Sequence, residues 1–331
     1  MSAWQEYKKK NPDYENPTVN KTHNSDSIFV AIPAFEEEDL YETVEDCFKK
    51  AANPAKIFIG IANQKIGTNF EDFSGFPNVR VVNTSSKFAL GLGLSFTIAM
   101  ALYDYQEFFL RIDAHSRFEQ DWDSILIKNY NIIKDDGYEK PIISYRIPCF
   151  EKKADGSLKF NDFSGPHVQG LKNELINITL PRTDGQTTLI EEDTHIEELW
   201  KTIIYKEHYF ISGHFIFASG SFVKDVFADP RIVFFGEEHT IAMRAHGNGY
   251  RMFAIGEQSV MTMGKTEQYF ENIGSNNWKY IHGSPTFLHQ NFSHHYKLIL
   301  RGKELGYFGA KDEKAYMEYA QAMGIDYGDI L

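Results

Sequence analysis

Residues 107–118 read EFFLRIDAHSRF, and this stretch decides how the rest of the chain is interpreted. Its apolar run predicts a buried β-strand that ends at Asp113, where polar residues begin. Side chains two positions apart on an extended chain point the same way, so we expect Asp113 and His115 to share one face. A carboxylate and an imidazole can hold two positions on a divalent cation and leave the others to a phosphate-bearing ligand. The alternative is a strand end that carries two solvated polar side chains.

The segments before this stretch alternate between strand and helix patterns. Strands are predicted at residues 27–33, 56–62, 78–83 and 108–112, and helices at residues 36–50 and 91–103. Such alternation indicates βαβ units, so the predicted fold class is α/β with a mainly parallel sheet flanked by helices. Ligands of these sheets bind at the carboxyl ends of the strands. Pro33, Ala34 and Asn63 lie at such ends, as does the segment of Asp113.

The rest of the chain is less regular. Helices are predicted at residues 121–133, 194–209 and 237–245, strands at residues 141–146, 210–218 and 250–254, and a long excursion at residues 151–193. A loop of that length is usually functional or disordered. We divide the chain into a polar N-terminal arm (1–26), an α/β domain (27–265) and a C-terminal extension (266–331) that is a candidate lid.

The composition favours a cytoplasmic protein. A net charge of −12 disfavours broad attraction to nucleic acid or to an anionic membrane. No apolar run approaches the roughly 18 residues of a membrane span, and the N-terminus lacks the apolar core of a signal peptide. Cys47 and Cys149 are the only cysteines, which is typical of a reducing compartment.

Two segments resemble a known family. Residues 111–126, RIDAHSRFEQDWDSIL, resemble the metal-site segment of GT-A-fold glycosyltransferases that use nucleotide sugars. Residues 210–255 resemble a second signature of the same group, in which a Gly-Phe-rich strand, an Asp-Pro and a Gly-Glu-Glu sequence precede a helix. The likeness is greatest to the polypeptide N-acetylglucosaminyltransferases that act on hydroxyproline in cytosolic proteins. The polypeptide N-acetylgalactosaminyltransferases resemble the chain more distantly.

The resemblance implies that Asp113 and His115 hold Mn²⁺ (or Mg²⁺), which bridges the diphosphate of a UDP-sugar donor. It also implies that Glu237 and Glu238 lie against the donor sugar or the acceptor, although two acidic residues at a helix start can equally serve the helix dipole. Related enzymes have a third metal ligand, a histidine, near residues 258–264, where this chain has none. A histidine of the C-terminal extension is then the candidate ligand. These histidines are His282, which we place first, His289, His294 and His295.

The resemblance extends to weaker site candidates around the donor. Uracil and ribose contacts are expected from Pro33, Ala34, Glu36 and Asn63, and a sugar contact from His214. Diphosphate contacts are expected from Gly91, Gly93 and one of Arg111 and Arg117, and Ala114 is a further donor-binding candidate. Gly91-x-Gly93 at a helix start is weak evidence alone. The aromatic residues expected to shield the diphosphate as part of a lid are Trp278, Tyr280 and Phe287.

The predicted activity is a metal-dependent transfer of N-acetylglucosamine or another hexose from a UDP-sugar to a hydroxyl, with retention of anomeric configuration. The resemblance makes a protein hydroxyl the first acceptor. A hydroxymethylated base in DNA is the alternative, and a non-catalytic sugar- or nucleotide-binding module is the alternative from another class. The excursion carries a modest basic set that bears on DNA binding. This set is Lys152, Lys153, Lys159, Lys172 and Arg182.

Overall fold

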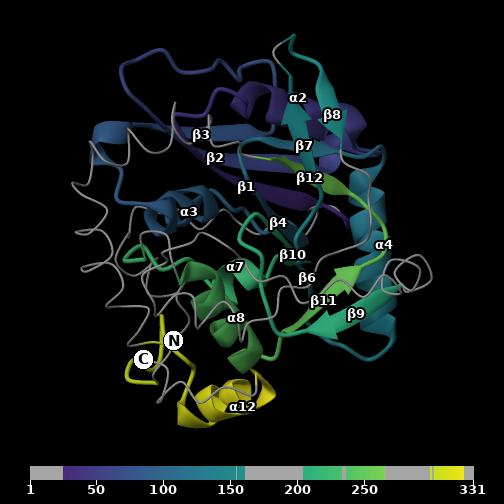
Figure 1. Ribbon diagram of the computed structural model, residues 1–331, viewed down its shortest axis with the longest axis vertical. Coiled ribbons are helices and arrows are strands. Elements are labelled where there is room, and N and C mark those ends of the chain that lie inside the picture. Colours follow the sequence, from purple (N-terminus) through teal and green to yellow (C-terminus); the bar gives the residue numbers. More distant parts are fainter. Residues whose placement is uncertain are drawn as a thin grey trace.

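The computed structural model describes residues 25–153, 155–160, 204–232, 236–264, 299 and 302–323. Within these ranges a central eight-stranded sheet has the strand order β3-β2-β1-β4-β10-β6-β11-β9 (Figure 1). Its strands are β1 (Ile28–Phe35), β2 (Ile57–Lys65), β3 (Val79–Ser85), β4 (Phe108–Ile112), β6 (Pro141–Ile143), β9 (Tyr205–His208), β10 (Phe215–Ser219) and β11 (Arg251–Ile255). The helices are α2 (Leu40–Lys50), α3 (Leu92–Ala101), α4 (Trp122–Asp135), α7 (Phe222–Asp225), α8 (Glu237–Gly247) and α12 (Glu313–Met323), with single 3-10 turns η1 (Pro54–Lys56) and η2 (Ser86–Phe88).

The first half of the sheet is parallel. β1 pairs in parallel with both β2 and β4, and β3 extends the block beyond β2. Helix α2 leads from β1 to β2 and α3 leads from β3 to β4, as the alternating patterns predict. Beyond β4 the sheet is mixed, because β10 runs antiparallel to both β4 and β6. The predicted α/β class with flanking helices is confirmed, and its parallel part is the part that carries the Asp113 segment.

Helices cover both faces of the sheet. One apolar cluster joins one face to α3, α7, α8 and α12, and a second joins the opposite face to α2 and α4 (Figure 1). Neighbouring strand residues point to opposite faces, so Phe29 and Ala31 of β1 belong to the first cluster while Ile28 and Val30 belong to the second. Burial on both sides explains why β1 is continuously apolar.

A second, four-stranded sheet lies beside the carboxyl end of β4. Its order is β5-β12-β7-β8, with β5 (Ser116–Phe118), β12 (Val260–Met263), β7 (Cys149–Lys152) and β8 (Leu158–Phe160). β12 runs antiparallel to β5, and the Met263 N–H donates to the carbonyl oxygen of His115 over 2.9 Å. The stretch 258–264, noted above for its lack of a histidine, therefore passes directly beside the Asp-His segment.

Several predicted elements differ from the structure. The predicted helix 36–50 begins only at Leu40, the predicted strand 141–146 ends at Ile143, and strand β8 lies within the predicted excursion. Residues 205–208, predicted as the end of a helix, form the edge strand β9, which pairs antiparallel with β11. The Tyr205 ring packs on Phe253 of β11, with ring centroids 5.5 Å apart. This contact across the two strands could not be predicted from the helical spacing of residues 194–209. The strand predicted from residue 210 begins only at Phe215, because Gly213 and His214 form a turn closed by the Phe215 N–H donating to the Ser212 oxygen.

Several predictions fall outside the described residues. They include the N-terminal arm, most of the excursion 151–193, residues 194–203 of the predicted helix, and the candidate lid with His282. Among the helices that the structure describes, none has the length and apolar character needed to cross a bilayer.

Candidate active site

Asp113 and His115 lie together in a tight turn between β4 and β5. Nε2 of His115 is 3.3 Å from Oδ2 of Asp113. The Asp113 side chain is 31% exposed, whereas that of His115 is 5% exposed, so the pair faces outward through the carboxylate. The expected proximity of the two side chains is present, although the backbone here is a turn rather than an extended strand.

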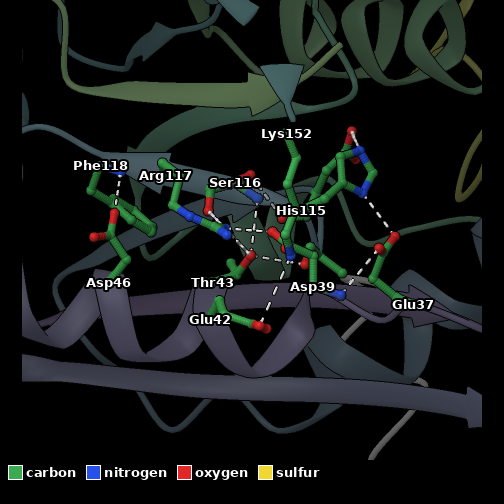
Figure 2. Close-up of polar contacts among 12 residues, drawn as sticks. Glu37, Asp39, Glu42, Thr43, Asp46, His115, Ser116, Arg117, Phe118 and Lys152 are labelled. Carbon is green, nitrogen blue, oxygen red and sulfur yellow. Dashed lines mark hydrogen bonds and ion pairs between the residues drawn. The ribbon is translucent and has the colours of Figure 1, made fainter. Parts of the chain in front are cut away.

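The other nitrogen of His115 is engaged by a buried carboxylate that sequence reasoning did not assign to the site. Nδ1 of His115 lies 2.9 Å from Oε2 of Glu37, whose side chain is 7% exposed (Figure 2). Glu37 follows β1 directly, at the same edge of the sheet as the Asp113 turn. The signal that could have found it was its place at the carboxyl end of a central parallel strand.

Helix α2 holds the backbone of the turn. The buried Thr43 hydroxyl lies 2.8 Å from the Ala114 oxygen, to which it donates, and accepts the Ser116 N–H over 3.0 Å. The Ser116 hydroxyl closes the turn by donating to the Asp113 oxygen over 2.8 Å. Ala114, expected at the phosphates, therefore has its carbonyl turned toward α2.

A buried ion cluster ties the second sheet to α2. Asp39, which is 2% exposed, lies 2.5 Å from Nη1 of Arg117 and 2.7 Å from Nζ of Lys152 (Figure 2). Because Arg117 comes from β5 and Lys152 from β7, the carboxylate joins both strands to the start of α2. Two members of the basic set are thus engaged within the protein, since Lys159 also pairs with Glu151 at 3.6 Å.

Arg111 and Glu237 form a buried bidentate ion pair. The two guanidinium–carboxylate distances are 2.6 and 2.8 Å, and the side chains are 3% and 2% exposed. The Arg111 guanidinium also stacks on Phe96 of α3, 3.4 Å from its ring centroid. Both oxygens of Glu237 are used in this pair, which links β4 to the start of α8. Its geometry is that of a supporting contact beneath the site.

Glu238 reaches toward the turn before β10. One of its carboxylate oxygens accepts the Gly213 N–H. A Cβ at Gly213 would lie 2.8 Å from that oxygen and 3.2 Å from Nη2 of Arg111, so a larger residue here would displace the ends of these two side chains. The next residue, His214, is half-buried, and loss of surrounding water lowers its pKa to about 4, a shift that the nearby Asp113 opposes. His214 is thus within electrostatic range of Asp113 and His115, and Glu238 contacts the residue before it.

Asn63 occupies the other end of the same sheet edge. It is fully buried, pairs with Ala34 across β1 and β2, and donates through Nδ2 to Glu71 over 2.9 Å. Burial tends to raise the pKa of Glu71, but hydrogen bonds from Lys65 and Asn63 lower it overall. The ionised carboxylate only accepts, which fixes the Asn63 amide. Its buried Oδ1 has no hydrogen-bond partner among the described residues.

The remaining nucleotide candidates differ in how they are placed. Pro33 lies within β1, and Glu36, just after it, has φ 48° and accepts the Ile66 N–H over 2.7 Å. Gly91 is the N-cap of α3. The N–H of Gly93 donates to the Ile232 oxygen and a Cβ there would lie 2.3 Å from the same oxygen, while its expected diphosphate contact stays a prediction. Gly93 serves the packing of α3.

No third histidine, cysteine, aspartate or glutamate joins Asp113 and His115 as a metal ligand within the part of the chain that the structure describes. His282, the first candidate for that position, lies outside it. The described donor set is therefore one carboxylate and one imidazole.

Comparison with known proteins gives the family. A family model described as glycosyltransferase (GlcNAc) matches residues 27–76 and 70–327, which is most of the chain. The chain belongs to this glycosyltransferase family and is an enzyme of that class. The match covers both the α/β domain and most of the C-terminal extension. No curated protein matches the chain significantly.

Solved structures resemble the chain more weakly. S. aureus TarS 1-349 in complex with UDP-GlcNAc is 11% identical with a TM-score of 0.43, over 83% of this chain and 70% of that one. GalNAc-T7 with UDP, GalNAc and Mn²⁺ is 14% identical with a TM-score of 0.46, over 91% of this chain and 55% of that one. At these TM-scores the likeness adds nothing to the family assignment. The family and the described architecture agree with the expected GT-A type.

Proposed function

We propose that the protein transfers N-acetylglucosamine from UDP-N-acetylglucosamine to an acceptor hydroxyl. The reaction would use a divalent cation held by Asp113 and His115, with Mn²⁺ as the first choice and Mg²⁺ as the second. The observation that carries the proposal is the Asp-His turn at the carboxyl edge of the parallel strands, backed by Glu37. Membership of a family described by GlcNAc supports this donor sugar over other hexoses.

The donor set fits a divalent cation. Two ligands at right angles on a metal about 2.1 Å away stand about 3 Å apart. The 3.3 Å between Oδ2 of Asp113 and Nε2 of His115 is close to that separation. A carboxylate and an imidazole leave several positions for phosphate oxygens, which suits a site completed by the donor. When bound there, the cation would neutralise charge on the departing diphosphate.

Asn63 is suited to reading the nucleobase. Its buried Oδ1 is an acceptor without a partner in the described ranges, and its Nδ2 is held by Glu71. The imide N–H of uracil is a donor that would satisfy this oxygen, whereas the corresponding ring nitrogen of cytosine only accepts. We therefore assign Asn63 to the uracil, with Pro33, Ala34 and Glu36 beside it.

The turn before β10 is suited to the donor sugar. His214 interacts electrostatically with Asp113, Glu238 contacts the preceding Gly213, and a carboxylate accepts hydrogen bonds from sugar hydroxyls. Glu237 contributes indirectly, because it holds Arg111 in place. Retention of anomeric configuration, with the leaving phosphate as the base on the same face, is part of the proposal.

The acceptor is proposed to be a hydroxyl on a polypeptide, with hydroxyproline the first choice from the resemblance. The engagement of Lys152 by the buried Asp39 leaves one cation fewer near the excursion for DNA phosphates. A hydroxymethylated base in DNA is accordingly the second acceptor to test.

The test is UDP release by the full chain from UDP-GlcNAc, UDP-GalNAc and UDP-glucose, with Mn²⁺, Mg²⁺ or EDTA. We expect UDP-GlcNAc with Mn²⁺ to be fastest, and EDTA to abolish turnover. Acceptors are then compared as hydroxyproline peptide, serine peptide and hydroxymethylated DNA. Binding of UDP-GlcNAc without UDP release under any of these conditions would favour a binding module instead.

A pair of matched variants locates the cation. Asp113→Asn should lose turnover at every Mn²⁺ concentration, whereas Asp135→Asn, at an exposed position at the end of α4, should behave as wild type. Equal turnover in Asp113→Asn and wild type at limiting Mn²⁺ would remove Asp113 from the metal site.

A further inference from the structure

Glu37 is one of two buried carboxylates in the acidic stretch that follows β1, and unlike Asp39 it contacts His115. Its neighbour Glu38 is exposed, whereas Glu37 is 5% exposed and directed at the His115 ring (Figure 2). A carboxylate buried to this degree needs a hydrogen-bonding partner, because an uncompensated charge inside a protein is costly. The 2.9 Å contact with Nδ1 of His115 is such a partnership.

The backbone after β1 is shaped to deliver Glu37. Glu36 adopts the left-handed conformation with φ 48°, donates its N–H to the Gln64 oxygen over 2.9 Å, and accepts the Ile66 N–H through its side chain. These contacts with the end of β2 hold the strained residue in place. The chain then turns inward, and Glu37 comes to lie against the imidazole.

The two nitrogens of His115 face different environments. Nδ1 faces Glu37, which is 7% exposed in its side chain, while Nε2 faces Asp113, which is 31% exposed and 3.3 Å away. A neutral imidazole carries one proton, and its position is set by the stronger acceptor contact. The shorter contact and the deeper burial are both on the Glu37 side, so the proton belongs on Nδ1.

We propose that Glu37 is a positioning residue that holds the proton of His115 on Nδ1 and thereby presents the Nε2 lone pair to the cation. The proposal rests on the proposed function for the identity of that cation. Thr43 fixes the backbone of the same turn by its contacts with Ala114 and Ser116. The main chain and the ring are therefore held by separate residues, one on α2 and one just before it.

The expected effects follow from the acceptors left after substitution. Loss of such an outer carboxylate typically weakens metal binding about 10- to 100-fold, which we expect for Glu37→Ala. Glu37→Gln keeps an amide oxygen that accepts from Nδ1–H, so its loss should be smaller. Glu38→Ala removes the adjacent exposed carboxylate and should bind Mn²⁺ as wild type does.

The experiment has two readouts on the full chain. The first is nitrogen NMR of metal-free protein labelled with ¹⁵N-histidine, in which His115 is assigned by its loss in His115→Ala. The spectra are recorded over a pH series, and the tautomer is read where the His115 ring is neutral, because two nearby carboxylates favour the doubly protonated ring. We expect a protonated Nδ1 and a bare Nε2 in wild type, and growth of the Nε2–H form in Glu37→Ala. The second is the dissociation constant of Mn²⁺ measured by electron paramagnetic resonance, in the order wild type, Glu37→Gln, Glu37→Ala from tightest to weakest.

The outcomes separate this inference from the proposed function. If His115→Ala loses Mn²⁺ while Glu37→Ala binds it as wild type does, the role of Glu37 is refuted and the metal site stands. If wild type and His115→Ala bind Mn²⁺ alike, the metal site is wrong and the inference falls with it. A neutral wild-type His115 ring that carries its proton on Nε2 refutes the inference without any variant, so the inference stays testable even if Glu37→Ala does not fold.

Discussion

Removal of one member of the Arg111–Glu237 pair should destabilise the protein more than it alters donor binding. Both side chains are at most 3% exposed, and the pair is bidentate at 2.6 and 2.8 Å. Substitution of Glu237 by Ala leaves the Arg111 guanidinium buried without its carboxylate. Breaking a buried pair in this way costs about 3–5 kcal/mol.

A double substitution should recover most of that loss. In Arg111→Met with Glu237→Leu, no unpaired charge is left behind, and the Met side chain can pack on the Phe96 ring that Arg111 now covers at 3.4 Å. Replacement of a buried ion pair by apolar residues of similar volume is often neutral or stabilising, by about 1–4 kcal/mol. We therefore expect the double variant to be more stable than either single variant.

Urea unfolding followed by tryptophan fluorescence measures these differences in the free energy of unfolding. The matched control is Glu238→Gln, which keeps an amide oxygen for the Gly213 N–H and should lower turnover more than stability. Exposed ion pairs contribute up to about 1 kcal/mol to stability. If the free energy of unfolding of Glu237→Ala is within that range of the wild-type value, the supporting role of the ion pair is refuted. A double variant less stable than both single variants would refute the desolvation argument.

Three other outcomes are expected. Asp113→Asn should keep the wild-type unfolding midpoint while it loses Mn²⁺-dependent UDP release, because the side chain is 31% exposed; a large drop in the midpoint would contradict this placement. Gly93→Ala should lower the free energy of unfolding by about 1–3 kcal/mol, because its Cβ would come 2.2 and 2.3 Å from the backbone oxygens of Asp229 and Ile232. The control is Gly75→Ala, whose Cβ meets nothing within 4 Å and which should leave thermal unfolding unchanged. Burial lowers the pKa of His208 to about 4, whereas an unfolded histidine has a pKa of about 6.5. Between these two values the unfolded chain binds a proton that the folded chain does not, so the free energy of unfolding should fall as the pH is lowered from about 6.5 toward about 4. His208→Gln should make that fall shallower, and an unchanged slope would contradict the assignment.

The parallel half of the fold could be predicted because its information is local. The apolar segments of β1, β2 and β4 are continuous, and each is followed by a helix pattern or a turn, so they indicate parallel βαβ units, whereas the place of β4 beside β1 is seen only in the structure. The same reasoning predicted the edge at which Asp113 and Asn63 would meet, since parallel strands deliver their carboxyl ends together.

Local patterns failed where pairing between distant segments decided the conformation. Residues 205–208 carry helical spacing but pair with β11, and the four strands of the second sheet are too short to be recognised singly. In such segments the hydrogen-bonding partner contributes more than intrinsic propensity does.

By itself, the sequence determined the α/β class, the edge that carries the site, and the Asp113–His115 pair, because each depends on residues adjacent in the chain. Only the tertiary structure decided that Glu37 backs His115, that Glu237 is used by Arg111, and that Gly93 serves packing. These roles depend on contacts between residues far apart in the sequence. The separations are 78 positions for Glu37 and His115, 126 for Arg111 and Glu237, and more than 130 for Gly93 and Ile232. Such contacts follow from how whole helices pack on the sheet. Side-chain type reveals which chemistry is available, but burial and the nearest partner decide which residue performs it.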